Sequence, residues 1–324
     1  MLLSSQIRIC CIVNERAGKG ETGLPARVSS AFARHGITPE FLCSGQGSSI
    51  AQVAKRAADG DFDIIVSGGG DGTANAVASE LVGSRTKLGV LPLGTLNHFA
   101  RDLKIPLELD AAVETIVTGN AEPIDVGEVN GKIFLNNSSV GLYPAVVRLR
   151  EGLERAGYGK WFALIRASIA MVARFRVVEL ELRSKTHSAT QRQTPLLFIG
   201  NNNYDTTLTR LGTREALDQG HLWVMMPAAS GPWRLLATAF ALIFIGEKPT
   251  DVISFEAEAL IVSSKHTHLS VAADGEVVQL QSPLKYRIRP KSLIVIVPGG
   301  QRTEPRPNVL GEHLDREMRV EGSR

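Results

Sequence analysis

The chain has 324 residues, of which 44% are hydrophobic and 21% charged, a composition typical of a globular protein and not of a disordered chain. Its 36 Lys and Arg residues nearly balance 33 Asp and Glu residues, and the net charge of +3 does not indicate a nucleic-acid-binding protein. The three cysteines, Cys10, Cys11 and Cys43, include an adjacent pair, which excludes a disulfide framework and fits a reducing compartment.

The N-terminal part of the chain alternates between apolar runs rich in β-formers and segments whose apolar residues recur at helical spacing. The apolar runs predict strands at Ile7–Val13, Phe41–Cys43, Phe62–Ser67 and Leu88–Leu91. The helical segments lie between and after them, over Leu24–Phe32, Ile50–Ala57 and Ala74–Val82. This alternation with short connections favours a parallel sheet covered by helices on both faces.

The pattern changes near Asp125, after which apolar runs are separated by polar turns, several with the period of two of a half-buried strand. These runs are Lys132–Asn136, Val177–Arg183, Leu196–Ile199, Leu222–Met226, His268–Ala272, Tyr286–Arg289 and Leu293–Val297. We therefore predict an α/β domain over residues 1–124 and an antiparallel β-sandwich or barrel over residues 125–298, with a helical insertion around Tyr143–Arg174. A ligand cleft is expected between the two domains, and the polar tail, residues 299–324, is free to pack back on the first.

The strongest functional signal is the loop Ser67–Thr73, directly after a predicted strand and directly before a predicted helix. Three consecutive glycines let a ligand approach the backbone N–H groups, and the helix that begins near Thr73 and Asn75 favours an anion at its N-terminus. Asp71 adds a carboxylate that can orient a phosphate or a metal. Because the loop lacks the Gly-Lys-Ser/Thr ending of a Walker A motif, we interpret it as a different phosphate cradle; the alternative is a glycine-rich turn without a ligand.

Two further loops also follow predicted strands. The loop over Leu91–Arg101 offers a turn glycine, a hydroxyl and an amide at Gly94, Thr95 and Asn97, and the loop that begins at Asn14 offers another amide. Each of these loops alone is also consistent with an ordinary connection. Since all three loops leave the carboxyl ends of predicted parallel strands, where open α/β sheets bind ligands, we expect them to meet.

A fourth segment, Ala273-Asp274-Gly275-Glu276, places two carboxylates beside a glycine between β-like runs. Asp-Gly commonly makes a tight hairpin turn, and from the residues alone we interpret the segment as such a turn.

Together these pieces resemble the diacylglycerol kinase catalytic-domain family, which includes bacterial lipid kinases and the sphingosine and ceramide kinases. Gly69–Thr73 is similar to the family signature, and Pro92–Arg101 to its second motif. Asp125 and Asp274–Glu276 follow in the expected order, so the resemblance covers residues 7–300. It implies an ATP-binding α/β domain and a β-sandwich domain that helps to hold a lipid, with the active site between them.

The resemblance also implies roles for individual residues. Glu276 would be the general base that removes the proton of a lipid hydroxyl, and Asp71 would organise phosphate or metal; Asp71 as the base is the rival assignment. ATP and Mg²⁺ are the implied cofactors. The candidates for the nucleotide site are Asn14, Ser44, Gly68, Gly69, Gly70, Asp71, Gly72, Thr73, Asn75, Thr95 and Asn97.

The sequence departs from the family pattern in two places. His98 stands where the family usually has Asp, and Gln219 replaces the second Asp of an Asp-Asp-Gly segment. Both changes remove a carboxylate from the Mg²⁺ network that the family implies. The remaining candidate metal ligands are Asp125, Asp218 and Gln219, the last through its amide oxygen.

Membrane contact is expected to be peripheral. The longest apolar run, near Leu235–Ile245, is shorter than the roughly 20 residues that a spanning helix needs. Val146–Arg176 combines arginines with aromatic and aliphatic residues, which fits either a helix lying on anionic lipid or an ordinary helix with one buried face. We expect a cytoplasmic protein at the inner face of the membrane, and a homodimer is compatible with the sequence.

The predicted function is that of an ATP-dependent lipid kinase, which phosphorylates a hydroxyl of diacylglycerol or a related lipid in phospholipid metabolism. One alternative is an NAD kinase-like or other small-molecule kinase, because the Gly-Gly-Asp-Gly motif is shared with NAD kinases and phosphofructokinases. The other is a non-catalytic nucleotide- or lipid-binding protein, which His98 and Gln219 would explain.

Overall fold

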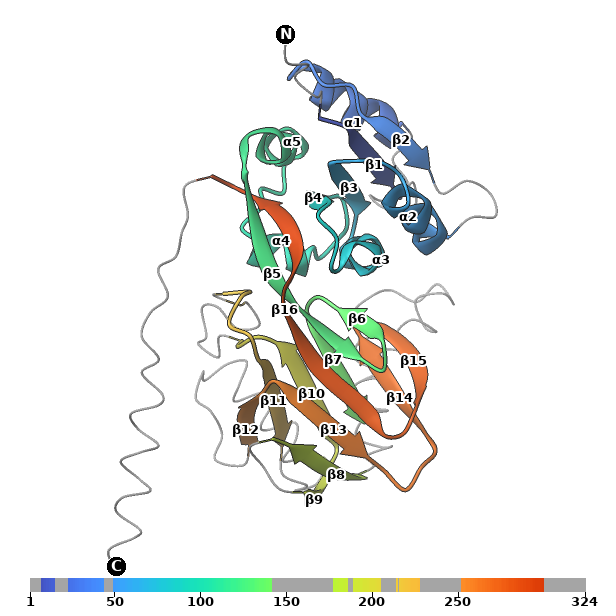
Figure 1. Cartoon of the computed structure of the whole chain (residues 1–324), viewed down its shortest axis with the longest axis vertical. Helices are drawn as coiled ribbons and strands as arrows, with labels where there is room; N and C mark the ends of the chain where they lie inside the picture. The colour runs from blue at the N-terminus through green and yellow to red at the C-terminus, as the bar shows by residue number, and fades with distance from the viewer. Residues whose placement is uncertain are drawn as a thin grey trace, which may run out of the picture.

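Two units joined by a pair of long strands make up the chain in the computed structural model (Figure 1). The structure describes residues 7–14, 23–43, 49–141, 177–185, 189–204, 214, 216–227 and 252–299, and the structural statements below concern these residues. The predicted helical insertion around Tyr143–Arg174, most of the polar tail and the apolar run near Leu235–Ile245 lie outside them. Within the described residues, no helix is long and apolar enough to span a bilayer.

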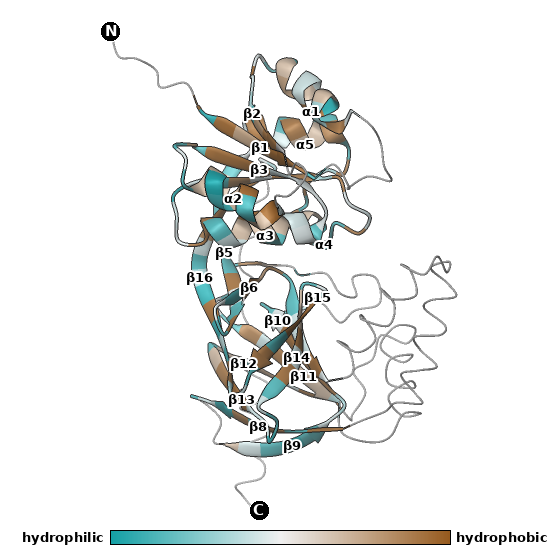
Figure 2. Ribbon diagram, turned by 90° about the vertical axis from the view of Figure 1, so that its right-hand side faces the viewer, coloured by the Kyte–Doolittle hydropathy of each residue, from teal (hydrophilic) through white to brown (hydrophobic). Residues whose placement is uncertain are grey.

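The first unit is an α/β layer structure. Its parallel strands are β1 (Ile9–Val13), β2 (Glu40–Cys43), β3 (Ile64–Gly69) and β4 (Lys87–Pro92), in the order β2-β1-β3-β4. Its helices are α1 (Leu24–Ala33), α2 (Ile50–Ala58), α3 (Asp71–Leu81), α4 (His98–Asp102) and α5 (Leu109–Thr118). In Figure 2, α2 and α3 lie on one side of the sheet and α1 and α5 on the other.

Apolar spacing explains how these helices dock. The four residues of the predicted stripe in α1, Leu24, Val28, Ala31 and Phe32, are all buried. In α2 the buried residues likewise recur at helical spacing, and a capping box between Ser49 and Gln52 satisfies the first backbone N–H groups. The predicted parallel sheet with helices on both faces is therefore confirmed.

The second unit is an antiparallel β-sandwich. Its remaining strands are β5 (Asn120–Val129), β6 (Lys132–Phe134), β7 (Asn137–Gly141), β8 (Val178–Ser184), β9 (Thr190–Thr194), β10 (Leu196–Asn201), β11 (Leu222–Pro227), β12 (Val252–Ala257), β13 (Ala259–Ser263), β14 (His268–Ala273), β15 (Glu276–Gln281) and β16 (Leu284–Val297). One layer is a six-stranded sheet in the order β12-β11-β10-β7-β14-β15. The opposite layer contains β16, β13, β8 and β9, and an apolar core fills the space between them. The fully buried Tyr286 of β16 joins the layers through a 3.1 Å hydrogen bond to Ser138 of β7.

The strands β5 and β16 run through both units. They pair antiparallel along their length, with a register shift between Arg289 and Leu293, and beyond the shift β16 joins the first sheet by pairing Val295 with Leu88 of β4. Leu293 is completely buried in the core of the first unit. Residues 293–297, which the sequence placed in the sandwich domain, thus complete the α/β unit.

Sequence patterns predicted two separate strands, Tyr286–Arg289 and Leu293–Val297, where the structure has the single strand β16. The break in the apolar pattern is Pro290 and Lys291, and Lys291 has a positive φ of 48° at the register shift. A bulge bends a strand without ending it, so the two apolar runs face different cores.

Leu293→Ala tests whether β16 holds the first unit together. The substitution removes a fully buried side chain from that core, so the free energy of unfolding should fall by about 2–5 kcal/mol in urea denaturation. Ile261→Ala on the neighbouring β13, where the side chain is 40% exposed, should change it by less than about 0.5 kcal/mol. Equal effects of the two substitutions would contradict the placement of Leu293.

Candidate functional site

The first residue after β1, Asn14, meets the loops that follow β3 and β4 at the carboxyl edge of the parallel sheet, where the sequence predicted three loops to meet. The backbone N–H of Asn14, after β1, donates to the carbonyl of Gly68 at 2.8 Å, and its side-chain amide donates to Thr73 Oγ1 at 3.2 Å. The backbone N–H of Leu93, after β4, donates to the carbonyl of Gly69 at 2.9 Å. Asn14 and the loops after β3 and β4 therefore form one surface around the first turn of α3.

Close packing explains two of the glycines in these loops, Gly94 against backbone and Gly69 against a side chain. A Cβ on Gly94 would lie 2.4 Å from the Cα of Gly70, and a Cβ on Gly69 would lie 2.3 Å from Thr73 Oγ1. Gly72 differs, because a Cβ there would meet nothing within 4 Å. The first turn of α3 is thus open on the side of Gly72, where the backbone N–H groups of a helix N-terminus are available to an anion.

Asp71 connects α3 to α4. Its two carboxylate oxygens accept the backbone N–H groups of His98 at 3.2 Å and Phe99 at 2.9 Å. These are the first residues of α4, whose N-cap residue Asn97 makes no side-chain capping bond. Asp71 therefore caps a neighbouring helix, and each of its oxygens retains a lone pair for a further partner.

Asn97 gives the β4–α4 loop its shape. Its side-chain oxygen accepts the N–H of Gly94 at 3.0 Å, and its amide donates to the carbonyls of Pro92 at 3.0 Å and Gly94 at 2.9 Å. Asn97 is buried with a φ of 53°, while Thr95 at the tip of the loop is exposed. Of these two predicted nucleotide-site residues, Thr95 presents its side chain to solvent and Asn97 folds the loop.

The segment Ala273–Glu276 is the hairpin turn between β14 and β15, as the sequence predicted. Asp274 and Gly275 have positive φ values of 46° and 85°, which suits a type I′ turn. Glu276 follows the turn with an exposed carboxylate, 3.1 Å from the Nζ of Lys132 on β6. Lys132 has no signal in the sequence, because nothing in its own neighbourhood marks it.

The carboxylate of Asp274 has a structural role that the sequence did not reveal. It accepts the backbone N–H groups of Leu135, Asn136 and Asn137 at 2.7, 2.8 and 3.1 Å and the side-chain amide of Asn75 at 2.6 Å. Burial raises the pKa of Asp274 above its ordinary value, and the four donors work against that rise. Asn75, a predicted nucleotide-site residue, is thus engaged with the second unit.

A buried arginine joins the same region to α4. Arg214 has no exposed side-chain surface, and its Nε lies 2.8 Å from the carboxylate of Asp102. Its guanidinium also donates to the carbonyls of Leu135 and Asn201 and to the side-chain oxygen of Asn136, at 2.7, 3.1 and 2.8 Å. Arg214 has no signal in the sequence, because its partners come from three distant segments.

The predicted metal ligands do not form an acidic cluster. The carboxylate of Asp125 accepts the backbone N–H groups of Gly220 at 2.6 Å and Lys291 at 2.8 Å, and the side-chain oxygen of Gln219 accepts the N–H of Asn203 at 3.2 Å. Asp218 is exposed. Among the residues that the structure describes, no group of three or more His, Cys, Asp and Glu side chains is placed to hold a metal ion. Ser44 lies outside these residues.

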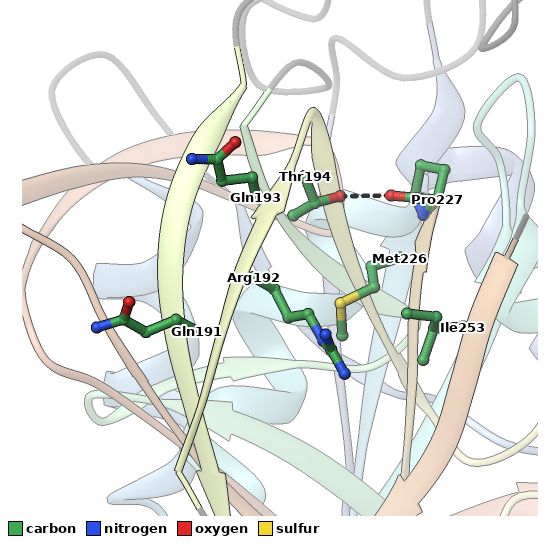
Figure 3. Close-up of a pocket in the computed structure, with 7 residues that line it drawn as sticks. All are labelled: Gln191, Arg192, Gln193, Thr194, Met226, Pro227 and Ile253. Carbon is green, nitrogen blue, oxygen red and sulfur yellow. Dashed lines mark hydrogen bonds between the residues drawn. The ribbon is translucent and has the colours of Figure 1, made fainter. Parts of the chain in front are cut away.

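A cavity of about 220 Å³ lies in the β-sandwich, and no residue of the glycine loops lines it (Figure 3). Its walls come from β9, β11 and β12, with Met226 and Ile253 beside Arg192, and a 2.9 Å hydrogen bond from Thr194 to the carbonyl of Pro227 closes one side. An adjoining hollow of about 170 Å³ shares Arg192, Met226 and Ile253. The recess is therefore of mixed character: Gln191, Arg192, Gln193 and Thr194 are polar, and Met226, Pro227 and Ile253 form its apolar part.

Comparisons with known proteins agree with this architecture. The family model described as the diacylglycerol kinase catalytic domain matches residues 8–129. A diacylglycerol kinase of Staphylococcus aureus (strain NCTC 8325 / PS 47) is 30% identical over 227 residues, which cover 69% of this chain and 71% of that protein.

Solved structures share the fold over most of the chain. A crystal structure of a putative diacylglycerol kinase from Bacillus anthracis str. Sterne superposes with a TM-score of 0.72 at 21% identity, covering 90% of this chain and 97% of that one. A second diacylglycerol kinase structure from the same organism, with the same coverage, gives 0.66 at 19% identity.

Two alanine substitutions distinguish the glycine that packs against backbone, Gly94, from the glycine that faces open space, Gly72. Gly94→Ala should lower the free energy of unfolding by about 1–3 kcal/mol, because the added Cβ collides with the backbone at Gly70. Gly72→Ala should leave it unchanged or raise it by up to about 1 kcal/mol, since the space is empty and alanine favours a helix. Chemical denaturation measures both, and a Gly94→Ala protein as stable as the parent would refute the loop contact.

Proposed function

Since this chain belongs to the diacylglycerol kinase catalytic-domain family and is a kinase, we propose that it transfers the γ-phosphoryl group of ATP to a hydroxyl of diacylglycerol or a related lipid. The observation that carries the proposal is the surface around the first turn of α3. Asn14 and the loops after β3 and β4 converge there, and the open side at Gly72 leaves backbone N–H groups for the phosphates.

A magnesium ion fits this surface as a companion of the nucleotide. Mg²⁺ is commonly held by one or two carboxylates together with substrate phosphates and water, so a closed cage of protein ligands is not required. Asp71 would hold it, because each of its carboxylate oxygens uses only one lone pair on α4. The ion would supply neutralisation of charge on the transferred phosphoryl group.

Glu276 is the proposed general base. The β14–β15 turn touches α3 at Asn75, which is only about 3 Å along the helix axis from Thr73 at the phosphate-binding end. Glu276 follows two residues after Asp274, exposed to solvent and oriented by its ion pair with Lys132. Asp71 suits the organising role better, since both of its oxygens already bind the amides of α4.

The β-sandwich is the proposed site for the apolar part of the lipid. The recess has an apolar part, Met226, Pro227 and Ile253, and Ile253 is 41% exposed, which suits contact with acyl chains. We further propose that the protein acts at the inner face of the membrane from the cytoplasm. The basic segment Val146–Arg176, outside the described residues, is the proposed contact with anionic lipid.

A labelling experiment tests the proposed function. Purified protein is incubated with γ-labelled ATP, Mg²⁺ and vesicles that contain diacylglycerol, monoacylglycerol, sphingosine or ceramide, and NAD is offered in a parallel reaction. Label should appear in the lipid fraction and rise with the content of the acceptor lipid. Label on NAD alone would favour a small-molecule kinase, and ATP binding without transfer to any acceptor would favour a non-catalytic protein.

Glu276→Gln tests the assignment of the base. Loss of the carboxylate should lower kcat for lipid phosphorylation by about 10²–10⁴-fold, while the affinity for ATP stays near that of the parent, because the proposed base acts on the acceptor. Glu258→Gln is a matched control, since Glu258 is also exposed and paired with a lysine, Lys185 at 3.4 Å. If Glu276→Gln retains full activity, Glu276 is not the base.

A further inference from the structure

The bend between β6 and β7, Leu135–Asn137, is gripped by two ionic side chains. Its three backbone N–H groups donate to the carboxylate of Asp274, and Arg214 donates to the Leu135 carbonyl and the Asn136 side chain. All of these bonds are made by side chains, so none of them belongs to the backbone ladder of a strand or a helix. Their bonds instead fix the position of one part of the β-sandwich.

Both ionic groups also reach across to the α/β unit. Asp274 accepts the amide of Asn75 on α3 at 2.6 Å, and Arg214 pairs with Asp102 on α4 at 2.8 Å. Asp71 then ties α3 to α4 through the backbone N–H groups of α4. Each of the three elements, α3, α4 and the Leu135–Asn137 bend, is thus connected to the other two.

We propose that Asn75 and Asp274 are positioning residues of the kinase site, whose hydrogen bond sets the β14–β15 turn, and with it Glu276, against the phosphate-binding end of α3. The proposal rests on the function proposed above. Asn75 lies in the second turn of α3, so its hydrogen bond to Asp274 leaves the first turn of the helix open. In Figure 2, β6 and β15 lie below α3 and α4.

The contacts of Asn75 fix the position of the β14–β15 turn relative to α3. Asn75 also donates to the carbonyl of Ile133 at 3.3 Å, so a single side chain touches both β6 and the β14–β15 turn. Lys132 and Glu276 are the neighbouring residues on those same two strands, and they pair with each other. A shift of the turn relative to α3 would therefore displace Glu276 and its lysine together.

Transfer between two bound groups is sensitive to such a shift. The attacking hydroxyl must lie in line with the phosphoryl group, and a displacement of about 1 Å can cost about 100-fold in rate without weakening the binding of either group. A positioning residue therefore affects kcat more than the KM for ATP. A residue that binds the nucleotide would show the opposite pattern.

Asn75→Leu is the substitution to test, because leucine has a similar volume and Asp274 keeps its three backbone donors. We expect kcat for lipid phosphorylation to fall about 10- to 100-fold, with the KM for ATP changed less than about twofold. Asn75→Gln, which keeps the amide, should recover part of kcat. Glu80→Gln, at an exposed position of the same helix, is the matched control and should leave both parameters unchanged.

A second measurement needs no substrate. Spin labels at Glu80→Cys on α3 and Gln279→Cys on β15, in a Cys43→Ser background, report the distance between the two units. Both labelled positions are exposed. Cys10 and Cys11 are buried, and burial raises the pKa of Cys10 to about 12, so these thiols stay unlabelled. The parent should give one narrow distance distribution, and Asn75→Leu should broaden or shift it.

The outcomes separate the two proposals. A parent that labels no lipid refutes the proposed function, and the distance distributions still decide whether the bond between Asn75 and Asp274 sets the turn. An Asn75→Leu protein with an unchanged distribution and unchanged kcat overturns the positioning role. A large rise in the KM for ATP with unchanged kcat also overturns it and assigns Asn75 to the nucleotide site instead.

Discussion

The structure depends on how the Leu135–Asn137 bend satisfies its polar groups. Three backbone N–H groups of the bend need acceptors, and the carboxylate of Asp274 provides them in one place. A buried polar group without a partner costs free energy, so these bonds restrict the bend to one position. The bend is also tied to α3 through Asn75 and to α4 through Arg214 and Asp102, so these contacts hold the sandwich against both helices.

Acidic side chains near the site are used mainly to hold backbone amides. Asp71, Asp125 and Asp274 each accept two or more N–H groups, and among the described residues these carboxylates do not gather around a metal position. These contacts hold the segments together without the two acids that the family resemblance implied at the positions of His98 and Gln219. Charge on the phosphates would then be met by the N-terminus of α3 and by a metal ion that arrives with the nucleotide.

Local patterns predicted the elements, and long-range contacts defined the site. The stripe of α1 and the glycine loops at the ends of β3 and β4 follow from spacing alone, because period and turn chemistry are local. Asp274 could be predicted as a turn residue but not as the acceptor of four hydrogen bonds, since its donors lie 137 to 199 residues away. The same limit hid Arg214 and Lys132, and Pro290 concealed the continuity of β16 between the two cores.

The central claim is that the two units present one kinase site, with phosphates on α3 and the base on the β14–β15 turn. A crystal structure of the protein with Mg²⁺ and a non-hydrolysable ATP analogue tests it most directly. We predict the terminal phosphate at the open first turn of α3, with Glu276 facing it across a gap that admits one lipid hydroxyl. Phosphates bound away from α3, or Glu276 turned out of reach of the terminal phosphate, would contradict the account.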